Sequence, residues 1–397
     1  MLQRPSKKDG RRSSSSSLPA LLQVIQQGEL RGAEVFALDL SRALAREGSW
    51  NVSVLSLFGM DESFVAAATR AGLHPTSVRP EGRAQGFDVR LVWKLRALIE
   101  RGQYQVVQAN GAATLKYLAV ARRLSRRPWS LVYRAIGMGS FWRRGPARRL
   151  AYRWLLGQPD VVVAVSRAVA DDLSAAAGVR AARAVVVPNG VDPLRIHHEP
   201  EDRERTRRAL GVAPAEHLLI YVGSLAQEKN LTALIAVVAQ CRQQGLPVKA
   251  VLIGDGPCRG QLAEEARRHQ VEEAIHFLPG QGTVGPFLAG ADVCVLPSLS
   301  EGMPALIIEA GLAGVPAVAY AVGGIPEVIE HGVTGMVLPM NDQPALAGAV
   351  ATLLTDGARR TRMGQAARER YRRFEIAQVA RAYSETYGAL LNGHHRG

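Results

Sequence analysis

The sequence has no apolar stretch of the length that a membrane-spanning helix needs, which is about 18 residues or more without a charge. Its most apolar region, residues 304–326, is interrupted by Glu309 and by several glycines. That composition is typical of buried parallel strands and closely packed helices rather than of a lipid-facing segment. We therefore expect no transmembrane helix, although a chain of 397 residues is long enough for two well-buried domains.

The chain contains few cysteines, and it shows no signal-peptide pattern. The three cysteines, Cys241, Cys258 and Cys294, show none of the spacings of a metal site, and free thiols in a reducing cytoplasm are the expected state. The chain begins with a basic, serine-rich segment without the apolar core of a signal peptide. Residues 1–18 are therefore predicted to be a disordered tail.

Acidic residues are missing from one long window of a strongly basic chain. Residues 101–150 contain 11 Lys and Arg residues and no Asp or Glu. The formal net charge of +14 belongs to the first 200 residues, which have 30 basic and 15 acidic side chains. Because a solvated surface usually mixes both signs, this window predicts an anionic partner for the first half of the chain.

Short apolar runs bounded by glycine or proline alternate with helical patterns throughout the chain. Examples are “YQVVQA” and “DVVVAVS” in the first half, and “VKAVLIGDG” and “ADVCVLPS” in the second. Alternation of this kind is typical of doubly wound parallel sheets. A charged, proline-containing segment, residues 197–217, separates the two series. We therefore predict two Rossmann-like α/β domains facing across a cleft, with ligands bound beyond the carboxyl ends of the strands.

One motif of the second half carries two acidic side chains among apolar and small residues. In “SLSEGMPALIIEAGLAG”, residues 298–314, Glu301 and Glu309 are eight positions apart, and Pro304 fits the first turn of a helix. Eight helical residues rise about 12 Å, which is roughly the reach from the sugar ring to the ribose of a nucleotide sugar. Free amides at the helix start suit a phosphate or sugar hydroxyls. The alternative is that Glu301 only caps the helix and Glu309 faces solvent.

At these residues the sequence resembles a known family, the retaining GT-B glycosyltransferases (group 1, family 4-like) with an E-x7-E motif. Besides Glu301 and Glu309, the resemblance rests on “RGAE”, “VPNGVD”, “VGSLAQEKN”, “VLIGDGP”, “FLPG” and “GGIPEVIEHGVTG”. It covers most of the chain and is denser in the second half. It implies an acceptor-binding domain over residues 19–195, a nucleotide-sugar-binding domain over 196–372, and a last helix, 373–393, that crosses back to the first domain.

The resemblance also implies roles for individual residues. Glu301 would contact the hydroxyls of the transferred hexose near the reacting carbon, and Glu309 would bind the ribose. Lys229 would pair with the diphosphate and neutralise the charge that grows on the leaving group. Neighbouring residues, mainly through their backbone, would complete the donor site: Gly32 in the first domain and Gly223, Ser224, Gly302, Met303, Pro304, Ala305 and Leu306 in the second.

Two departures from the family pattern affect the predicted site. Many members have an arginine where this sequence has Ser224, so phosphate binding must depend on Lys229 and on helix amides. Many members also have a histidine where this sequence has Ile136, and His74 is the sole histidine before residue 197. As substitutes on the acceptor side, we predict Asn110, Arg134 and the amides around Gly137.

The chain also lacks the Asp-x-Asp triplet with which metal-dependent nucleotide-sugar enzymes hold Mg²⁺ or Mn²⁺ on the diphosphate. We therefore expect no metal and no cofactor, with Lys229 and the helix dipole stabilising the leaving group. The donor would be a UDP-, GDP- or ADP-sugar. No protein base is evident near the acceptor. This fits the family's retaining chemistry, in which the leaving phosphate takes the acceptor proton on the same face of the sugar.

Aromatic residues interleave with arginines around the end of the acid-free window. On a helix that begins near Pro146, Arg149 and Arg153 are four residues apart, and Leu150 and Trp154 can form an apolar side. Such a helix can rest in the headgroup layer of an anionic membrane. The alternative is that Leu150, Trp154 and the neighbouring leucines belong to the core, with the arginines on a solvated face. Both interpretations stay open at this point.

These features together predict a bacterial hexosyltransferase that lies in the cytoplasm, peripheral to the inner face of the cell membrane. It would move a hexose to a lipid-linked or polysaccharide acceptor in cell-surface glycan biosynthesis, such as that of lipopolysaccharide. The alternatives are a nucleotide-sugar 2-epimerase and a catalytically silent protein that binds membranes or polyanions. A nicotinamide site is not expected at “GDGPCRG”, residues 254–260, because its third glycine comes one position late. No nucleic-acid-binding module is recognised.

Overall fold

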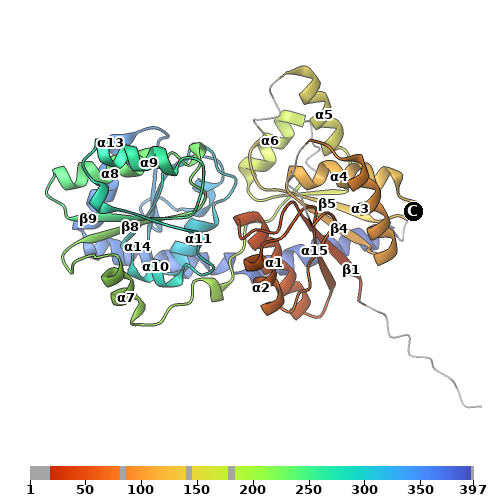
Figure 1. Cartoon of the computed structure of the whole chain (residues 1–397), viewed down its shortest axis with the longest axis horizontal. Helices are drawn as coiled ribbons and strands as arrows, with labels where there is room; N and C mark the ends of the chain where they lie inside the picture. The colour runs from red at the N-terminus through yellow and green to blue at the C-terminus, as the bar shows by residue number, and fades with distance from the viewer. Residues whose placement is uncertain (1–17, 81–85, 140–144, 178–183, 395–397) are drawn as a thin grey trace, which may run out of the picture.

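The computed structural model describes residues 18–80, 86–139, 145–177 and 184–394. Within this part of the chain the strands form two separate parallel sheets, each packed between helices (Figure 1). The predicted fold class, two doubly wound α/β domains, is confirmed. The predicted N-terminal tail lies, apart from Leu18, outside the described residues.

The first domain is built on a parallel sheet whose described strands number seven. Its elements are β1 (Ala20–Ile25), α1 (Gly32–Arg46), β2 (Asn51–Ser56), α2 (Glu62–Arg70), β3 (Thr76–Ser77), α3 (Val89–Gly102), β4 (Val106–Asn110), α4 (Ala112–Leu124), β5 (Ser130–Ala135), α5 (Pro146–Leu156), β6 (Val161–Ala164), α6 (Arg167–Ala177) and β7 (Ala184–Val186). The strand order is β3-β2-β1-β4-β5-β6-β7, so the winding reverses between β1 and β4. Strands β4 and β5 are buried along their whole length, as expected for central parallel strands covered on both faces, and this burial includes the polar Gln108, Asn110 and Arg134.

The second domain repeats this plan with six described strands in the order β10-β9-β8-β11-β12-β13. Its elements are α7 (Asp202–Ala209), β8 (His217–Val222), α8 (Leu231–Gln243), β9 (Val248–Ile253), α9 (Arg259–Arg268), β10 (Ile275–Leu278), α10 (Gly285–Gly290), β11 (Val293–Leu296), α11 (Ala305–Leu312), β12 (Ala317–Tyr320), α12 (Ile325–Val328), β13 (Gly335–Leu338), α13 (Gln343–Thr355) and α14 (Gly357–Arg370). The winding reverses between β8 and β11. Ligands bind at such a reversal, beyond the carboxyl ends of the strands.

The chain passes between the domains twice, and the two passages are hydrogen-bonded to each other. The first follows β7, and the second joins a short 3-10 helix, η6 (Tyr371–Phe374), to the last helix, α15 (Ile376–His394). The amide of Val191 donates to the carbonyl of Phe374 at 2.9 Å, and the amide of Ile376 donates to the carbonyl of Val191 at 2.8 Å. The two passages therefore form one paired connection.

Helix α15 belongs to the core of the first domain although it ends the chain (Figure 1). One face of it packs against α1 and the start of the sheet. The indole nitrogen of Trp50 also donates to the Ser384 hydroxyl at 2.9 Å. The buried residues of this cluster include Leu21, Phe36, Leu40, Leu44, Trp50, Ile376, Val379, Ala380, Tyr383 and Tyr387.

Helix α5 has an apolar side that the core does not cover. Leu155 is buried, but Leu150 is 71% exposed and Trp154 is 46% exposed. Arg149 and Arg153 of the same helix are exposed as well. Leu155 therefore fits the core interpretation, whereas Leu150 and Trp154 do not. No helix among the described residues is long and apolar enough to cross a bilayer.

Candidate functional site

The segment that carries the two glutamates joins the carboxyl end of β11 to α11. Strand β11 ends at Leu296 and the helix begins at Ala305, so Glu301 lies in the connecting loop and Glu309 in the second helical turn. Pro304 was predicted to lie in the first turn of the helix. Its extended ψ of 121° instead places it directly before the first helical residue, Ala305. The two carboxylates do not share one continuous helix, so the expected rise of about 12 Å between them does not apply.

Glu301 is held by two side chains from the ends of neighbouring strands. The Lys229 ammonium donates to Glu301 Oε1 at 2.7 Å, and the Ser298 hydroxyl donates to the same oxygen at 2.7 Å. Lys229 ends a short 3-10 helix, η4 (Gln227–Lys229), in the connection from β8 to α8. Because Glu301 is buried, these partners offset the cost of placing a charge there. Ser298 was not among the predicted site residues, although it stands three positions before Glu301.

The predicted residues Gly223 and Ser224 directly follow β8. Gly223 has a φ of 150°, a backbone conformation that favours glycine, and a Cβ there would lie 2.8 Å from the Tyr221 hydroxyl. That hydroxyl donates to the carbonyl of Ser224 at 2.8 Å. The side chain of Ser224 is exposed and carries no charge. The turn is therefore fixed by Tyr221, and the cation at the diphosphate must come from another residue.

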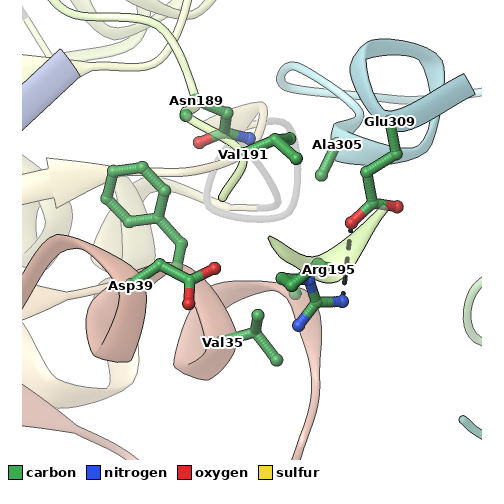
Figure 2. A pocket seen from close by; sticks show the side chains of 10 residues that line it. Val35, Asp39, Asn189, Val191, Arg195, Ala305 and Glu309 are labelled. Carbon is green, nitrogen blue, oxygen red and sulfur yellow. Dashed lines mark ion pairs between the residues drawn. The ribbon is translucent and has the colours of Figure 1, made fainter. Parts of the chain in front are cut away.

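Glu309 lines a small cavity between the two domains. Figure 2 shows the Glu309 carboxylate pointing toward Arg195, and the distance from Oε1 to the guanidinium Nη2 is 3.5 Å. The cavity is partly open to solvent, and its volume of about 40 Å³ is room for a few water molecules. Its lining comes from α1, from the first passage between the domains and from α11: Gly32, Val35, Phe36, Asp39, Asn189, Gly190, Val191, Arg195, Ala305 and Glu309.

Acidic groups of α1 near this cavity are strongly perturbed. Burial raises the pKa of Asp39 to about 6, against the opposing effects of Arg195 and Arg42, and the Glu309 charge raises it further. Burial also raises the pKa of Glu34 to about 7, although its own backbone amide and the charges of Arg31 and Arg134 act in the opposite direction. At neutral pH, Asp39 is therefore mostly ionised, whereas the negative charge of Glu34 is only partly developed.

The loop after Glu301 is pinned to the first domain by polar contacts. The Ser166 hydroxyl donates to the carbonyl of Gly302 at 3.0 Å, and the side-chain amide of Asn189 donates to the carbonyl of Met303 at 2.5 Å. A Cβ on Gly302 would lie 2.1 Å from the carbonyl oxygen of Ile136, so this contact requires glycine. Gly302 and Met303 therefore lie where the two domains touch.

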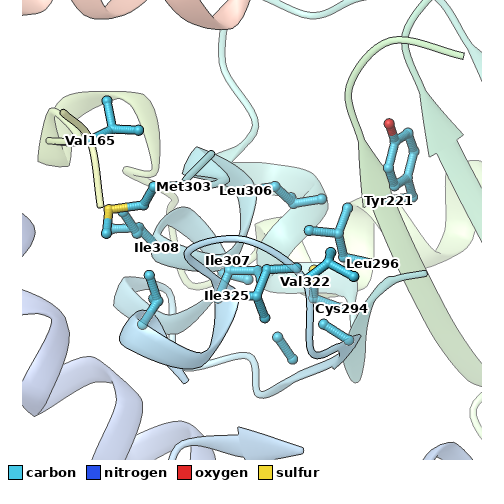
Figure 3. Close-up of a cluster of buried hydrophobic side chains, with 14 of the residues drawn as sticks. Val165, Tyr221, Cys294, Leu296, Met303, Leu306, Ile307, Ile308, Val322 and Ile325 are labelled. Carbon is cyan, nitrogen blue, oxygen red and sulfur yellow. The ribbon is translucent and has the colours of Figure 1, made fainter. Parts of the chain in front are cut away.

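A carboxylate and an apolar contact extend this interface. Glu327 on α12 accepts from the amides of Arg167 and Ala168 at 2.9 Å each, so it caps the N-terminus of α6 in the other domain. Figure 3 shows Met303 beside Val165, which directly follows β6, while Leu306 and Ile307 of α11 turn toward the core of the second domain. The structure thus has its domains in direct contact around the motif.

The predicted acceptor-side residues lie in two different environments. Asn110 is buried and donates to Gln23 Oε1 at 2.9 Å, within a network beneath the site. Arg134 is 1% exposed, donates to Asn189 Oδ1 at 2.5 Å, and stacks on the Phe36 ring at 3.7 Å from its centroid. Burial lowers the pKa of Arg134. Of the three predicted residues, only Gly137 is exposed to an incoming acceptor.

Both halves of the chain match known protein families. Residues 30–195 match the family described as “Glycosyltransferase Family 4”, and residues 202–370 match “Glycosyl transferases group 1”. The GDP-mannose-dependent alpha-(1-6)-phosphatidylinositol monomannoside mannosyltransferase of Mycobacterium tuberculosis is 31% identical over 320 residues, which are 78% of this chain and 80% of that protein. This chain belongs to the group 1 glycosyltransferases.

Two further relatives of this glycosyltransferase align over a smaller part of their length. Glycogen synthase of M. tuberculosis is 31% identical over 263 residues, which are 65% of this chain. The N-acetyl-alpha-D-glucosaminyl L-malate synthase of Bacillus anthracis is 28% identical over 248 residues, or 62% of this chain. The matched region spans 61% of the first protein and 64% of the second.

Solved structures of glycosyltransferases share the fold over nearly the whole chain. Anabaena Alr3699/HepE, in complex with UDP and glucose, has a TM-score of 0.81 at 25% identity and covers 94% of this chain and 100% of its own. WaaG, described as a glycosyltransferase involved in lipopolysaccharide biosynthesis, has a TM-score of 0.73 at 17% identity, covers 92% of this chain and 99% of its own, and shows the fold alone. The predicted GT-B arrangement is confirmed.

Proposed function

We propose that this glycosyltransferase is a retaining, metal-independent hexosyltransferase that uses a nucleotide-diphosphate sugar. The observation that carries the proposal is the pairing of Lys229 with Glu301 at the carboxyl ends of β8 and β11, before the N-terminus of α11. This is the position at which doubly wound sheets bind ligands. It brings a cation for the diphosphate within hydrogen-bond distance of a carboxylate for the sugar.

Each predicted donor contact has a matching chemical group. The two oxygens of Glu309 can accept from both hydroxyls of a ribose, and those of Glu301 from hydroxyls of the hexose. The Lys229 ammonium has three hydrogens, so it can donate to a phosphate oxygen while it keeps Glu301. The first amides of α1 and α11, at Gly32 and Ala305, have no helical partner and suit the anionic diphosphate.

In the proposed reaction, the bond between the anomeric carbon and the diphosphate oxygen breaks, and its electron pair leaves with the phosphate. The acceptor oxygen forms a new bond to the same carbon on the same face of the sugar. Its proton passes to the departing phosphate oxygen, so no protein base is needed. Lys229 and the helix amides stabilise the charge on the leaving group, a task that a metal performs in other enzymes.

The small interdomain cavity adds a step to this reaction. Only about 40 Å³ is free around Glu309, so we propose that the donor enters when the domains are further apart and that the contacts of Gly302 and Glu327 re-form around it. Closure of this kind excludes water, which would otherwise compete with the acceptor hydroxyl.

We further propose a lipid-linked or polysaccharide acceptor in cell-surface glycan biosynthesis and a peripheral position at the cytoplasmic face of the membrane. The support is the acid-free basic window together with the exposed Leu150 and Trp154 on α5. Each cation near an anionic bilayer contributes about 1 kcal/mol within a Debye length. Binding to anionic vesicles at low salt should therefore weaken in the Arg149→Glu plus Arg153→Glu variant. Binding that is unchanged by lipid charge and by these substitutions would contradict the membrane proposal.

Donor turnover by the purified protein tests the catalytic proposal. UDP-, GDP- and ADP-hexoses are incubated with and without membrane lipid extract, and the release of the nucleotide diphosphate and the anomeric configuration of the product are followed. One donor should be consumed with retention, and EDTA should leave the rate unchanged. Inversion, or a rate that EDTA abolishes and Mg²⁺ or Mn²⁺ restores, would contradict it.

A catalytically silent protein is the second candidate, favoured by Ile136 at the position where the family pattern described above often has histidine. The same assay separates the two functions. Tight binding of a nucleotide diphosphate without donor consumption in any lipid extract would favour the silent protein. Interconversion of the free nucleotide sugar with its 2-epimer would instead indicate the epimerase.

A further inference from the structure

Three cationic side chains near the donor cavity already have close partners in the described part of the chain. The ammonium of Lys229 is 2.7 Å from Glu301, the guanidinium of Arg42 is paired with Asp192, and that of Arg134 is buried against Asn189 and Phe36. None of these three lines the cavity itself.

Arg195 differs from these cations in both position and partner. It ends a short 3-10 helix, η3 (Pro193–Arg195), in the first passage between the domains, and its side chain lines the cavity. The side chain is 22% exposed, and its nearest described carboxylate, Glu309, is 3.5 Å away. Among the described residues its guanidinium has this ion pair and no closer hydrogen-bond acceptor. Most of its five N–H donors are therefore available to a ligand.

The cavity around Arg195 is suited to a phosphate group. Gly32 and Ala305, the first residues of α1 and α11, both line it, so the positive ends of two helix dipoles converge there. A Cβ on Gly32 would meet no atom within 4 Å, so the space beside the start of α1 is open. The nearby carboxyl of Asp39 has a raised pKa and is therefore easier to neutralise when an anion binds.

We propose that Arg195 binds the phosphate nearest the ribose in the donor's nucleotide diphosphate. The inference rests on the proposed function, in which Glu309 binds the ribose. A guanidinium 3.5 Å from the ribose-binding carboxylate is within reach of the first phosphate attached to that ribose. Arg195 then supplies, from the interdomain passage, the forked cation that the uncharged Ser224 cannot supply from the loop after β8.

This assignment divides the diphosphate between two cations. Arg195 holds the phosphate on the ribose side, and Lys229, beside the sugar-binding Glu301, holds the phosphate on the sugar side. Arg195 follows the paired connection at Val191, and its carbonyl accepts from the Val284 amide of the second domain at 3.2 Å. The donor can therefore engage Arg195 together with Glu309 before the first domain closes over it.

The test compares ligands that differ only in phosphate. UDP, GDP and ADP are first titrated against the wild-type protein by calorimetry. For the base that binds, the affinities of the nucleoside, its monophosphate and its diphosphate are measured by competition. The variants are Arg195→Gln, Arg195→Lys and, as a matched control, Arg208→Gln on the exposed side of α7. Thermal melting confirms that each variant is folded.

Arg195→Gln should weaken binding of the monophosphate and the diphosphate by about tenfold to hundredfold and leave the nucleoside affinity unchanged. Arg195→Lys should show a smaller loss, because lysine keeps the charge without the fork, and Arg208→Gln should show none. Unchanged phosphate affinities would overturn the inference. An equal loss for the nucleoside would overturn it too, because Arg195 would then act by positioning Glu309. If none of the three diphosphates binds the wild-type protein, the proposed function itself fails.

Discussion

Replacing Glu34 by glutamine should stabilise the first domain at alkaline pH and flatten its dependence on pH. Burial in the first turn of α1 raises the pKa of this carboxyl from 4.5 to about 7. As the pH rises through this interval, the unfolded chain loses its proton before the folded one does, so the free energy of unfolding falls. The stability from this group is complete below about pH 4.5 and is lost above about pH 7.

The size of the effect follows from the interval between the two pKa values. Each pKa unit corresponds to about 1.4 kcal/mol, so the interval corresponds to about 3 kcal/mol. Because Glu34 is partly accessible to solvent, screening reduces the expected effect to about 2 kcal/mol. For a domain of this size, that corresponds to a rise in melting temperature of about 4–8 °C for Glu34→Gln at pH 8, and to a much smaller rise at pH 5.

Tryptophan fluorescence suits this measurement because all five tryptophans lie within the first 154 residues. Their signal therefore reports unfolding of the domain that contains Glu34. Glu62→Gln is the matched control, since Glu62 stands in the first turn of α2 and is exposed. A Glu34→Gln variant that is less stable than the wild type at pH 8, or that gains the same amount at both pH values, would refute the reasoning.

Three further predictions concern the site and the interface. Glu309→Ala should weaken nucleotide diphosphate binding by about 1.5–3 kcal/mol in calorimetry, because it removes charged hydrogen bonds to the ribose; an unchanged affinity in a folded variant would reject that role. Glu301→Ala should lower turnover far more than affinity for the free nucleotide, and a kinetic and binding comparison that gives the reverse would exchange the two roles. Glu327→Ala should favour the open arrangement, because two amides of α6 lose their acceptor. Small-angle scattering should show a larger radius of gyration for this variant, and an unchanged radius would mean that other contacts hold the domains together.

The two sheets could be predicted because buried parallel strands are recognisable in the sequence as short apolar runs. Runs such as those of β11 and β12 are apolar on both faces and end at glycine, proline or a polar turn. Lys229 and Glu301 follow such runs, so their meeting at one edge could be anticipated from topology. The start of α11 could be predicted only to within one residue, because a proline fits both the first turn of a helix and the position before it.

Other features of the site depend on packing that no local pattern records. Asn110 and Arg134 lie side by side near the carboxyl ends of adjacent strands, as catalytic residues often do, yet both are covered by side chains far away in sequence. Arg195 belongs to a passage that the sequence marks only as polar and proline-containing, and its approach to Glu309 depends on how the domains meet. Leu150 and Trp154 have the spacing of a core stripe, and their exposure is decided by neighbouring helices.

The packing of α15 on the first domain has a consequence for biosynthesis. Phe36, Leu40 and Trp50 are covered by a helix that the ribosome makes roughly 300 residues later, which takes about 15–60 s at ordinary rates of translation. During that time the nascent first domain presents an apolar strip to the cytosol, while the entire second domain is being synthesised. Chaperones that shield such a strip would act on this chain until α15 can pack against it. A stop codon shortly before Ile376 would damage the domain that was made first rather than the one that was made last.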